Sequence, residues 1–346
     1  MSKYNVAVYG ATGHTGRFVA SELERRGVAV RRIARRPPTE SSSQKDSGLF
    51  TWVSASCDDP EALDRALEGS DAIINCAGPF LDTAPAVIES ALRVGAHYLD
   101  VAAEQRSVRQ SLATYSAEAT DRGIVVLPAM AFYGGLADLL AAQICTGLQV
   151  VDEILIGVAL DYWHPTAGTR RTGERNTARR IIVSEGRLAA LPAPAARGRW
   201  QFPLPFGDLL VSSVPLSEII TIAGHITANR IESFMSEAPL KDLGNADTPP
   251  PVSADERGRS TQTFVMDVFA SGEGLSKRIA AFGRDIYAVS ALLVVEACIR
   301  VLSQSPRTGG TFAPAELFDP SDFLAALSSD IRVESISQPC PMRNID

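Results

Sequence analysis

The sequence lacks the features that would indicate a metal, a membrane or a nucleic acid. Its five cysteines form no CxxC pair and have no metal-ligand spacing, so we expect reduced, buried thiols and no metal site. The net charge of −7 gives no basic excess for nucleic-acid binding. The longest apolar helical stretch, residues 288–302, contains Glu296 and Arg300 and is shorter than a bilayer requires, so no membrane span is expected.

Targeting signals and repeats are also missing. The first three residues lead directly into an apolar run, which leaves no room for a signal peptide, and a cytoplasmic location is expected. No internal repeat of fixed period is visible. At 346 residues the chain exceeds what one hydrophobic core usually serves, so two domains are expected.

The segment YNVAVYGATGHTGR, residues 4–17, is the strongest positive signal. An apolar run at 5–9, expected as a buried strand, leads into three glycines and then into an expected helix. Gly10 permits a tight turn, Gly13 lets backbone N–H groups approach a pyrophosphate, and Gly16 lets the helix pack on the strand. Unpaired N–H groups at the helix start would face the anion, so this context predicts dinucleotide binding.

The end of the second expected strand, residues 28–33, indicates which dinucleotide to expect. Arg35 and Arg36 follow it, and no acidic residue lies between 28 and 38. A carboxylate here would bind the 2′-hydroxyl of NAD, whereas guanidinium groups hold the 2′-phosphate of NADP. We therefore expect NADP rather than NAD; the alternative is that both arginines only end a solvated strand. The serine-rich stretch 39–48 is expected to be a loop.

The order of elements predicts the fold class. The first part alternates strands with helices, which predicts an α/β fold with a doubly wound parallel Rossmann sheet. Beyond residue 150, short apolar runs with prolines predict an α+β domain on a mainly antiparallel sheet. Strands are expected at 5–9, 28–33, 49–54, 72–76, 97–101, 124–127, 154–160 and 264–269. Helices are expected from the glycine-rich turn toward residue 26, from the segment 57–60 to about 68, and at 85–94, 105–121, 136–145 and 286–302. The stretch 244–261 is expected to be a linker or a mobile loop.

Several residues at the carboxyl ends of the expected strands are candidates for cofactor contact. Asp58 or Asp59 either caps the next helix or contacts the adenine ring. Small residues after a strand let a flat ligand approach closely, at the edge where such sheets bind ligands; the alternative is a Gly-Pro turn without a ligand. These residues are Cys76, Ala77, Gly78 and Pro79.

The sequence contains several candidate catalytic residues, but no specific catalytic motif. Asp100 and Glu104 lie at the edge where a nicotinamide would lie, although Glu104 is equally placed to cap the helix that follows. Tyr133, Tyr162 and His164 are further candidate proton donors. Aromatics at 161–164 and cations at 168–175 form either a pocket for an acidic group or a solvated helix through residue 180.

One catalytic arrangement is missing. No tyrosine has a lysine four residues further on, as short-chain dehydrogenases require, since Tyr98, Tyr115 and Tyr133 are each followed there by alanine. That alcohol dehydrogenase mechanism is excluded.

Several of these motifs occur together in a known family. The chain resembles the saccharopine dehydrogenase-like oxidoreductases, including the trans-acting enoyl reductase branch. The motifs that carry the resemblance are VYGATGHTG at 8–16, INCAGPF at 74–80 and HYLD at 97–100, and more loosely PLSEIIT at 215–221, GRDIY at 283–287 and TGGTFAP at 308–314.

The resemblance implies an NAD(P)-binding Rossmann domain, an inserted substrate domain and a C-terminal helix that rejoins the first domain. We expect their limits at 1–145, 146–282 and 283–346. It further implies that Arg35 and Arg36 hold the ribose phosphate and that Ala77 and Gly78 face the nicotinamide. By the same similarity, the pyrophosphate would be wrapped by Gly10, Thr12, Gly13, His14, Thr15 and Gly16.

One segment departs from the family. FYGGLAD at 132–138 stands where the family often has a Phe-Asp-Ser-x-Pro-Ser-Asp-like segment, and only Asp138 matches. Saccharopine chemistry itself is therefore not expected.

The expected function is NADP-dependent hydride transfer to or from a C=C or C=N bond of a small molecule. The alternative is a non-catalytic NADP-binding sensor or scaffold, because the sequence shows no recognisable catalytic set. An apolar sheet in the second domain would allow a homodimer.

Overall fold

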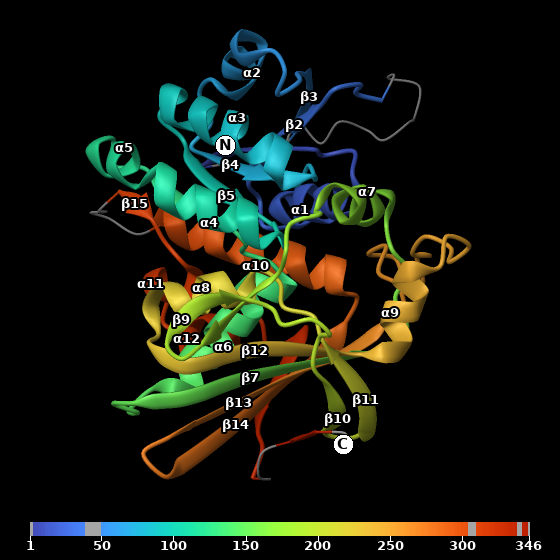
Figure 1. The fold of residues 1–346 in the computed structure, drawn as a ribbon. Helices are drawn as coiled ribbons and strands as arrows, with labels where there is room; N and C mark the ends of the chain where they lie inside the picture. Colours follow the sequence, from blue (N-terminus) through green and yellow to red (C-terminus); the bar gives the residue numbers. More distant parts are fainter. Residues whose placement is uncertain (1–2, 39–49, 304–308, 338–340, 345–346) are drawn as a thin grey trace. The chain divides into compact units, whose positions relative to one another are not determined.

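The computed structural model describes residues 3–38, 50–303, 309–337 and 341–344, so the loop expected at 39–48 lies outside it. The chain forms two compact units (Figure 1). Unit 1 consists of Met1–Ala131 and Ser290–Phe312, and unit 2 of Phe132–Val289 and Ala313–Asp346. These units differ in their limits from the predicted domains 1–145, 146–282 and 283–346, which stay a prediction.

The sheet of unit 1 has seven strands in the order β15-β6-β5-β4-β1-β2-β3, and every neighbouring pair is parallel. Apolar side chains of β1 are buried on both faces, as a central parallel strand requires. The predicted doubly wound Rossmann sheet is thus confirmed. The strands are β1 (Asn5–Tyr9), β2 (Ala29–Ala34), β3 (Phe50–Ser54), β4 (Ala72–Asn75), β5 (His97–Asp100), β6 (Val125–Leu127) and β15 (Gly310–Thr311).

The seventh strand was not predicted. β15 has only two residues, and it reaches the sheet from the C-terminal part of unit 1 to pair with β6. Gly309 permits this approach, because a Cβ atom there would lie 2.1 Å from the carbonyl oxygen of Ala119. So short a strand has no periodicity that a sequence pattern could reveal.

The helices of unit 1 largely follow the prediction, with two corrections. α3 begins at Phe80 rather than at 85 and contains Pro85, because the carboxylate of Glu104 accepts the backbone N–H of Phe80. The helix predicted at 105–121 breaks at Tyr115. The helices of this part are α1 (His14–Arg25), α2 (Pro60–Leu67), α3 (Phe80–Val94), α4 (Gln105–Thr114), α5 (Ser116–Asp121) and α10 (Ile286–Ser303).

By length and composition alone, α10 is the one helix among the described residues that is able to cross a membrane, with a mean hydropathy of 1.9, but 67% of it is buried within the protein. Its Glu296 forms ion pairs with Arg26, the residue after α1, at 2.5 Å, and with Arg300, at 2.7 Å. The helix therefore has the burial and the internal charge pairs of a core helix.

The sheet of unit 2 is mixed and mainly antiparallel, as predicted. Ten strands are described, and only β12 and β7 pair in parallel. The main path runs β16-β14-β13-β7-β12-β11-β10-β17, and the β8–β9 hairpin attaches to β12. The strands are β7 (Val151–Leu160), β8 (Ile181–Ser184), β9 (Arg187–Ala190), β10 (Arg197–Gln201), β11 (Asp208–Ser213), β12 (Ala228–Ser236), β13 (Thr263–Gly272), β14 (Leu275–Arg284), β16 (Ile331–Ser335) and β17 (Met342–Asn344).

The helices of unit 2 contain one irregular element. Phe132–Leu136 forms a π-helical turn, η1, directly before α6 (Ala137–Cys145), where an ordinary helix from 136 was predicted. Such turns are rare and often lie at functional sites. The predicted helix through residue 180 ends instead at Arg175. The remaining helices are α7 (Ala167–Arg175), α8 (Glu218–His225), α9 (Glu237–Gly244), α11 (Pro314–Leu317) and α12 (Pro320–Ala326).

The core of unit 2 encloses a polar network, here called the Asp267 network. Asp267 and Arg278 are almost fully buried and form an ion pair at 2.5 Å. The indole N–H of Trp200 donates to the same carboxylate at 2.8 Å, and Arg278 also donates to the carbonyl of Gln201. Gly157 lies against the Trp200 ring, since a Cβ atom there would be 2.4 Å from the ring atom Cε2.

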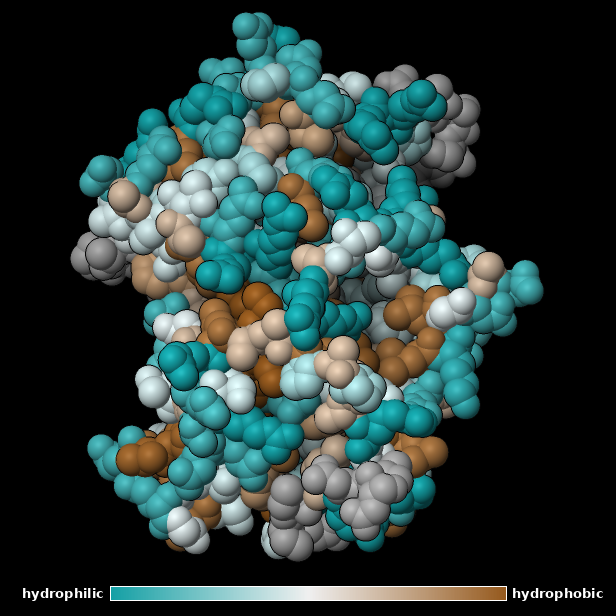
Figure 2. Space-filling model, in the orientation of Figure 1, coloured by the Kyte–Doolittle hydropathy of each residue, from teal (hydrophilic) through white to brown (hydrophobic). Residues whose placement is uncertain are grey.

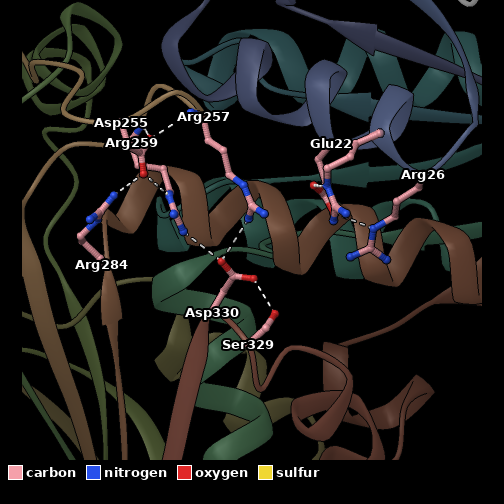
Figure 3. Close-up of polar contacts among 9 residues, drawn as sticks. Glu22, Arg26, Asp255, Arg257, Arg259, Arg284, Ser329 and Asp330 are labelled. Atoms are coloured by element: carbon pink, nitrogen blue, oxygen red, sulfur yellow. Dashed lines mark hydrogen bonds and ion pairs between the residues drawn. The ribbon is translucent and has the colours of Figure 1, made fainter.

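A second charged cluster fixes the stretch predicted as a linker or mobile loop. Residues 245–262 contain no helix or strand, but Arg259 pairs with Asp255 at 2.8 Å and with Asp330 at 3.0 Å (Figure 3). Arg284, the last residue of β14, also pairs with Asp255. These pairs hold the stretch to β14 and to the turn before β16.

Figure 2 shows hydrophilic residues over the helices that cover the sheet of unit 1. In the described part of the chain the large exposed hydrophobic residues are Val150, Leu188, Leu204, Leu210, Val252 and Leu275.

Candidate functional site

The glycine-rich turn between β1 and α1 has the tight geometry that its sequence predicts. Gly10 has a φ of +82°, and a Cβ atom on it would lie 2.9 Å from Cβ of Ala77. A Cβ atom on Gly16 would lie 2.3 Å from the carbonyl oxygen of Gly10, so only glycine lets α1 pack this closely on β1. Gly13 is the N-cap and offers no side chain to the first N–H groups of α1. A ligand bound at this turn would face those groups.

Beside this turn, unit 1 has a hollow of about 490 Å³. Arg35 and Arg36 are exposed, and neither guanidinium forms a hydrogen bond or an ion pair with any residue that the structure describes. The hollow is lined by Thr12, Arg35, Arg36 and Ser56. Two cations without counter-ions at the rim of a hollow are suited to an anionic ligand.

The two arginines within β2, Arg31 and Arg32, are instead bound by other groups of the protein. Arg32 pairs with Glu24 at 2.6 Å and lies over the ring of Phe50. Arg31 donates to the backbone carbonyls of Ala66 and Glu68. Of the four arginines at the end of β2, two are therefore fixed by the protein and two are not.

The structure separates the roles of the two aspartates after β3. Asp59 caps α2, because its carboxylate accepts the N–H of Ala62 at 3.0 Å. Asp58 is exposed and accepts the hydroxyl of Ser56 at 3.0 Å, and Ser56 lines the hollow. The helix cap thus belongs to Asp59, which leaves Asp58 beside the candidate cofactor site.

The turn after β4 lies against the glycine-rich turn. Cys76, Ala77, Gly78 and Pro79 are half-buried, and the side-chain oxygen of Asn75 accepts the N–H of Ala77 at 3.0 Å. Burial raises the pKa of the Cys76 thiol, and the charge of Asp100 raises it further. Cys76 is therefore a protonated thiol rather than a nucleophile.

The candidates Asp100 and Glu104 both hold backbone groups. Asp100 is fully buried and accepts the N–H groups of Ala102 and Ala129 and the hydroxyl of Tyr98, at 2.7–2.9 Å. Burial raises the pKa of its carboxyl. Glu104 accepts the N–H of Phe80 at 2.8 Å, and burial raises its pKa to about 7. Glu104 thus caps α3, and not the helix that follows it.

The candidates Tyr162 and His164 lie together in unit 2, with their ring centres 4.5 Å apart. The Tyr162 hydroxyl shares a hydrogen bond with Thr261 at 2.9 Å. The cations of α7 nearby form no buried pocket, because no residue of α7 is buried and Arg170 donates to the carbonyls of Asn245 and Thr248.

Tyr133 differs from the other candidates. Its ring lies 5.0 Å from that of Phe132 and 6.1 Å from that of Trp163, and its hydroxyl oxygen is buried without a partner in the described part of the chain. Arg180 and Glu218 of the same unit also each have a buried polar atom without a partner. The sequence-based search missed both, although Glu218 stands out as the one charge in the apolar motif PLSEIIT.

His14 and Thr15 lie in the first turn of α1, where His14 makes an edge-to-face contact with Phe18 at 5.2 Å. The candidate residues therefore fall into two sets. The cofactor candidates, with Asp100 and Glu104, lie in unit 1, and Tyr133, Tyr162 and His164 lie in unit 2. Within the described ranges, no three His, Cys, Asp or Glu side chains gather as metal ligands do.

Comparisons with known proteins agree with the geometry of unit 1. Residues 6–127 match the family described as saccharopine dehydrogenase NADP binding domain. The human saccharopine dehydrogenase-like oxidoreductase is 25% identical over 154 residues, which cover 39% of this chain and 36% of the human protein. The trans-acting enoyl reductase of Mycobacterium ulcerans (strain Agy99) is 24% identical over 143 residues, or 40% of this chain and 34% of that protein. The matches thus span about a third of these relatives' own length.

Two solved structures share the fold across most of the chain. The apo saccharopine dehydrogenase (L-Glu forming) from Saccharomyces cerevisiae has a TM-score of 0.67 at 14% identity, covering 96% of this chain and 100% of the yeast chain. The DAP dehydrogenase of C. glutamicum, in complex with DAP, has a TM-score of 0.51 at 13% identity, covering 95% and 99%. At these identities the likeness shows the fold alone.

Proposed function

We propose that this chain, whose first unit carries a domain of the saccharopine dehydrogenase NADP-binding family, is an NADP-dependent oxidoreductase acting on a C=C or C=N bond of a small molecule. The glycine-rich turn, with two unpaired guanidinium groups beside it, is the observation that carries the proposal. A nicotinamide cofactor, when bound, supplies or accepts the hydride.

The residues present fit such a cofactor. Gly10, Gly13 and Gly16 leave room for the backbone that would hold the pyrophosphate, with Thr12, His14 and Thr15 around it. The guanidinium groups of Arg35 and Arg36 match the fork of acceptors on a 2′-phosphate, which NADP has and NAD lacks. The small residues Ala77 and Gly78 leave room for a flat ring.

Replacing both Arg35 and Arg36 with alanine tests the choice of cofactor. We expect NADPH affinity to fall by about tenfold or more, because charge-assisted hydrogen bonds are lost, and NADH affinity to change little. Fluorescence titration of both cofactors measures this. Arg109→Ala, which removes an exposed arginine of α4, is the matched control. An equal loss for both cofactors would show that the arginines do not read the 2′-phosphate.

The variant Gly13→Val tests the pyrophosphate site itself. Its side chain blocks the approach to the first N–H groups of α1, so we expect NADPH binding to be lost while the circular dichroism spectrum stays that of the wild type. Undiminished NADPH affinity in this variant would remove the site from the glycine-rich turn.

A non-catalytic sensor or scaffold remains the second candidate function, because the carboxylate oxygens of Asp100 and Glu104 accept hydrogen bonds from backbone N–H groups. Tight NADPH binding without substrate-dependent loss of NADPH absorbance, across imine, enoyl and keto compounds, would favour it. A cytoplasmic location and a homodimer through the sheet of unit 2 are also proposed from the sequence. Cell fractionation and light scattering test these two points.

A further inference from the structure

Eight side-chain polar atoms in unit 2 are buried without a hydrogen-bond partner among the described residues. Three of them belong to neighbouring elements: the hydroxyl oxygen of Tyr133, Nη1 of Arg180 and Oε2 of Glu218. Buried donors and acceptors in native proteins are nearly always paired, because an unpaired one loses its hydration without compensation. Three such atoms on elements that pack together therefore indicate a ligand that would pair with them.

The fold brings the three side chains together from separate parts of the chain. Tyr133 belongs to η1, Arg180 immediately precedes β8, and Glu218 is the first residue of α8. α8 packs against both η1 and β8. Burial raises the pKa of the Tyr133 hydroxyl, and the nearby Glu218 contributes to the rise. Glu218 and Tyr133 in turn act on the pKa of Arg180, which burial lowers. The three groups thus lie within electrostatic reach of one another.

Glu218 has one oxygen in use and one free. Its side chain is almost fully buried, and Oε1 accepts the N–H of Leu216 at 2.8 Å and the hydroxyl of Ser233. Burial raises the pKa of its carboxyl, while the hydrogen bond from Ser233 and the charge of Arg180 act to lower it. When the carboxyl is protonated, the free oxygen, Oε2, is an O–H donor.

Arg180 carries a charge without a counter-ion. Its guanidinium forms no ion pair with the part of the chain that the structure describes, and Nη1 is buried. Burial lowers its pKa, but an arginine in a protein keeps its proton. A planar fork of N–H donors matches the two oxygens of a carboxylate. The missing partner is therefore an anion of that shape.

We propose that Tyr133, Arg180 and Glu218 form a binding site for the carboxylate of a small molecule that has no ammonium group beside this carboxylate. With the carboxyl of Glu218 protonated, three donors suit the oxygens of one carboxylate, whereas an adjacent ammonium would meet the charge of Arg180. The rings of Phe132 and Trp163 next to Tyr133 add an aromatic wall. The role of this acid as the substrate rests on the oxidoreductase function proposed above. The binding of the acid to this site does not depend on that function.

The test uses three related probes and the full chain without cofactor. The probes are 3-phenylpropanoate, its amide 3-phenylpropanamide, and phenylalanine, which adds the ammonium group. Titration calorimetry is expected to give 3-phenylpropanoate a Kd of about 1 mM or lower. The other two probes should bind about tenfold more weakly or worse, because each loses a charge-assisted contact or gains a repulsion.

Two variants and a control assign the binding to these residues. Arg180→Gln and Tyr133→Phe should each weaken 3-phenylpropanoate binding, by about tenfold or more for the arginine and about threefold or more for the tyrosine. Arg187→Gln, on the same β8–β9 hairpin but 81% exposed in its side chain, should leave it unchanged. Absence of binding to the wild type, equal binding of acid and amide, or undiminished binding by Arg180→Gln would overturn the proposal. So would tightest binding of phenylalanine, because Glu218 would then be the counter-ion of an ammonium group.

The Gly13→Val variant separates this site from the cofactor site. Carboxylate binding that persists while NADPH binding is lost supports both assignments. If the wild type binds the acid but no NADPH, only the oxidoreductase function fails. If it binds NADPH but not the acid, only the carboxylate site fails.

Discussion

Unit 2 contains two buried groups that each combine an arginine, a carboxyl and an aromatic donor, and they differ in how their atoms are paired. In the Asp267 network, both carboxylate oxygens bind Arg278 and one also accepts from Trp200. Around Tyr133, in contrast, Arg180 and Glu218 each keep an unpaired atom. The same chemical groups therefore serve stability in one place and leave capacity for a ligand in the other.

Asp267→Ala should have the largest effect, because it leaves Arg278 buried and without a counter-charge. We expect the free energy of unfolding to fall by about 3–5 kcal/mol. Urea unfolding followed by circular dichroism measures it. Asp208→Ala is the control, since Asp208 pairs with Arg199 at the surface and should contribute far less to stability. Equal losses in the two variants would mean that the Asp267 network is no more structural than a surface pair.

Gly157→Ala should have the next largest effect on stability, because the added methyl group would overlap the ring of Trp200, which Asp267 holds in place. We expect a loss of about 3 kcal/mol in the same unfolding experiment. Gly173→Ala is the control, as its Cβ would meet no atom within 4 Å and it lies inside α7. That variant should be more stable than the wild type, by up to about 1 kcal/mol. If the Gly157→Ala variant were as stable as the wild type, the ring of Trp200 would be free to move.

Glu104 extends the comparison to a buried carboxyl that has no arginine partner. Its pKa in the folded protein is raised by burial to about 7, above its value in the unfolded chain, so the folded state binds more protons between the two values. Its contribution to stability is present at low pH and is lost as the pH rises through about 7.

Glu104→Gln keeps the oxygen that accepts the N–H of Phe80 but removes the charge. We expect this variant to be more stable than the wild type by about 2 kcal/mol at about pH 8, and to differ little at about pH 4. Urea unfolding at both pH values is the measurement. A difference that is constant with pH would contradict the raised pKa of Glu104.

Arg180→Gln should have the smallest effect on stability, since it breaks no hydrogen bond or ion pair with the described residues. Without a ligand we expect the free energy of unfolding not to fall, because the variant removes a partly buried charge that has no counter-ion. A loss comparable to that of Asp267→Ala would place Arg180 among the structural arginines and remove the contrast between the two groups.

The local features that the sequence predicted are those with a strong local cause. The strand at 5–9 has the predicted limits, because an apolar run followed by Gly10 has few other ways to fold. The family resemblance and the two kinds of sheet are also confirmed. The start of α3 was predicted wrongly, because the carboxylate that caps it, Glu104, lies 24 residues further along the chain.

The residues that the prediction missed depend on contacts between distant segments. Arg180 looked like the end of a solvated helix, and only the structure shows that Nη1 of its guanidinium is buried. Glu218 lies in a strongly apolar motif, where a pattern cannot tell which oxygen stays unpaired. Asp58 and Asp59 were equivalent as helix caps in the sequence, and the backbone geometry selects Asp59.

The edge strand β15 has a consequence for the way the protein is made. Its two residues complete the sheet of unit 1 only after the ribosome has synthesised more than 300 residues, including the first and longer of the two segments of unit 2. Until then, the backbone groups of β6 on that edge have no strand to pair with. Neither half of the chain, expressed separately, contains all the strands of the parallel sheet, so splitting the gene at residue 131 should give a first fragment that aggregates.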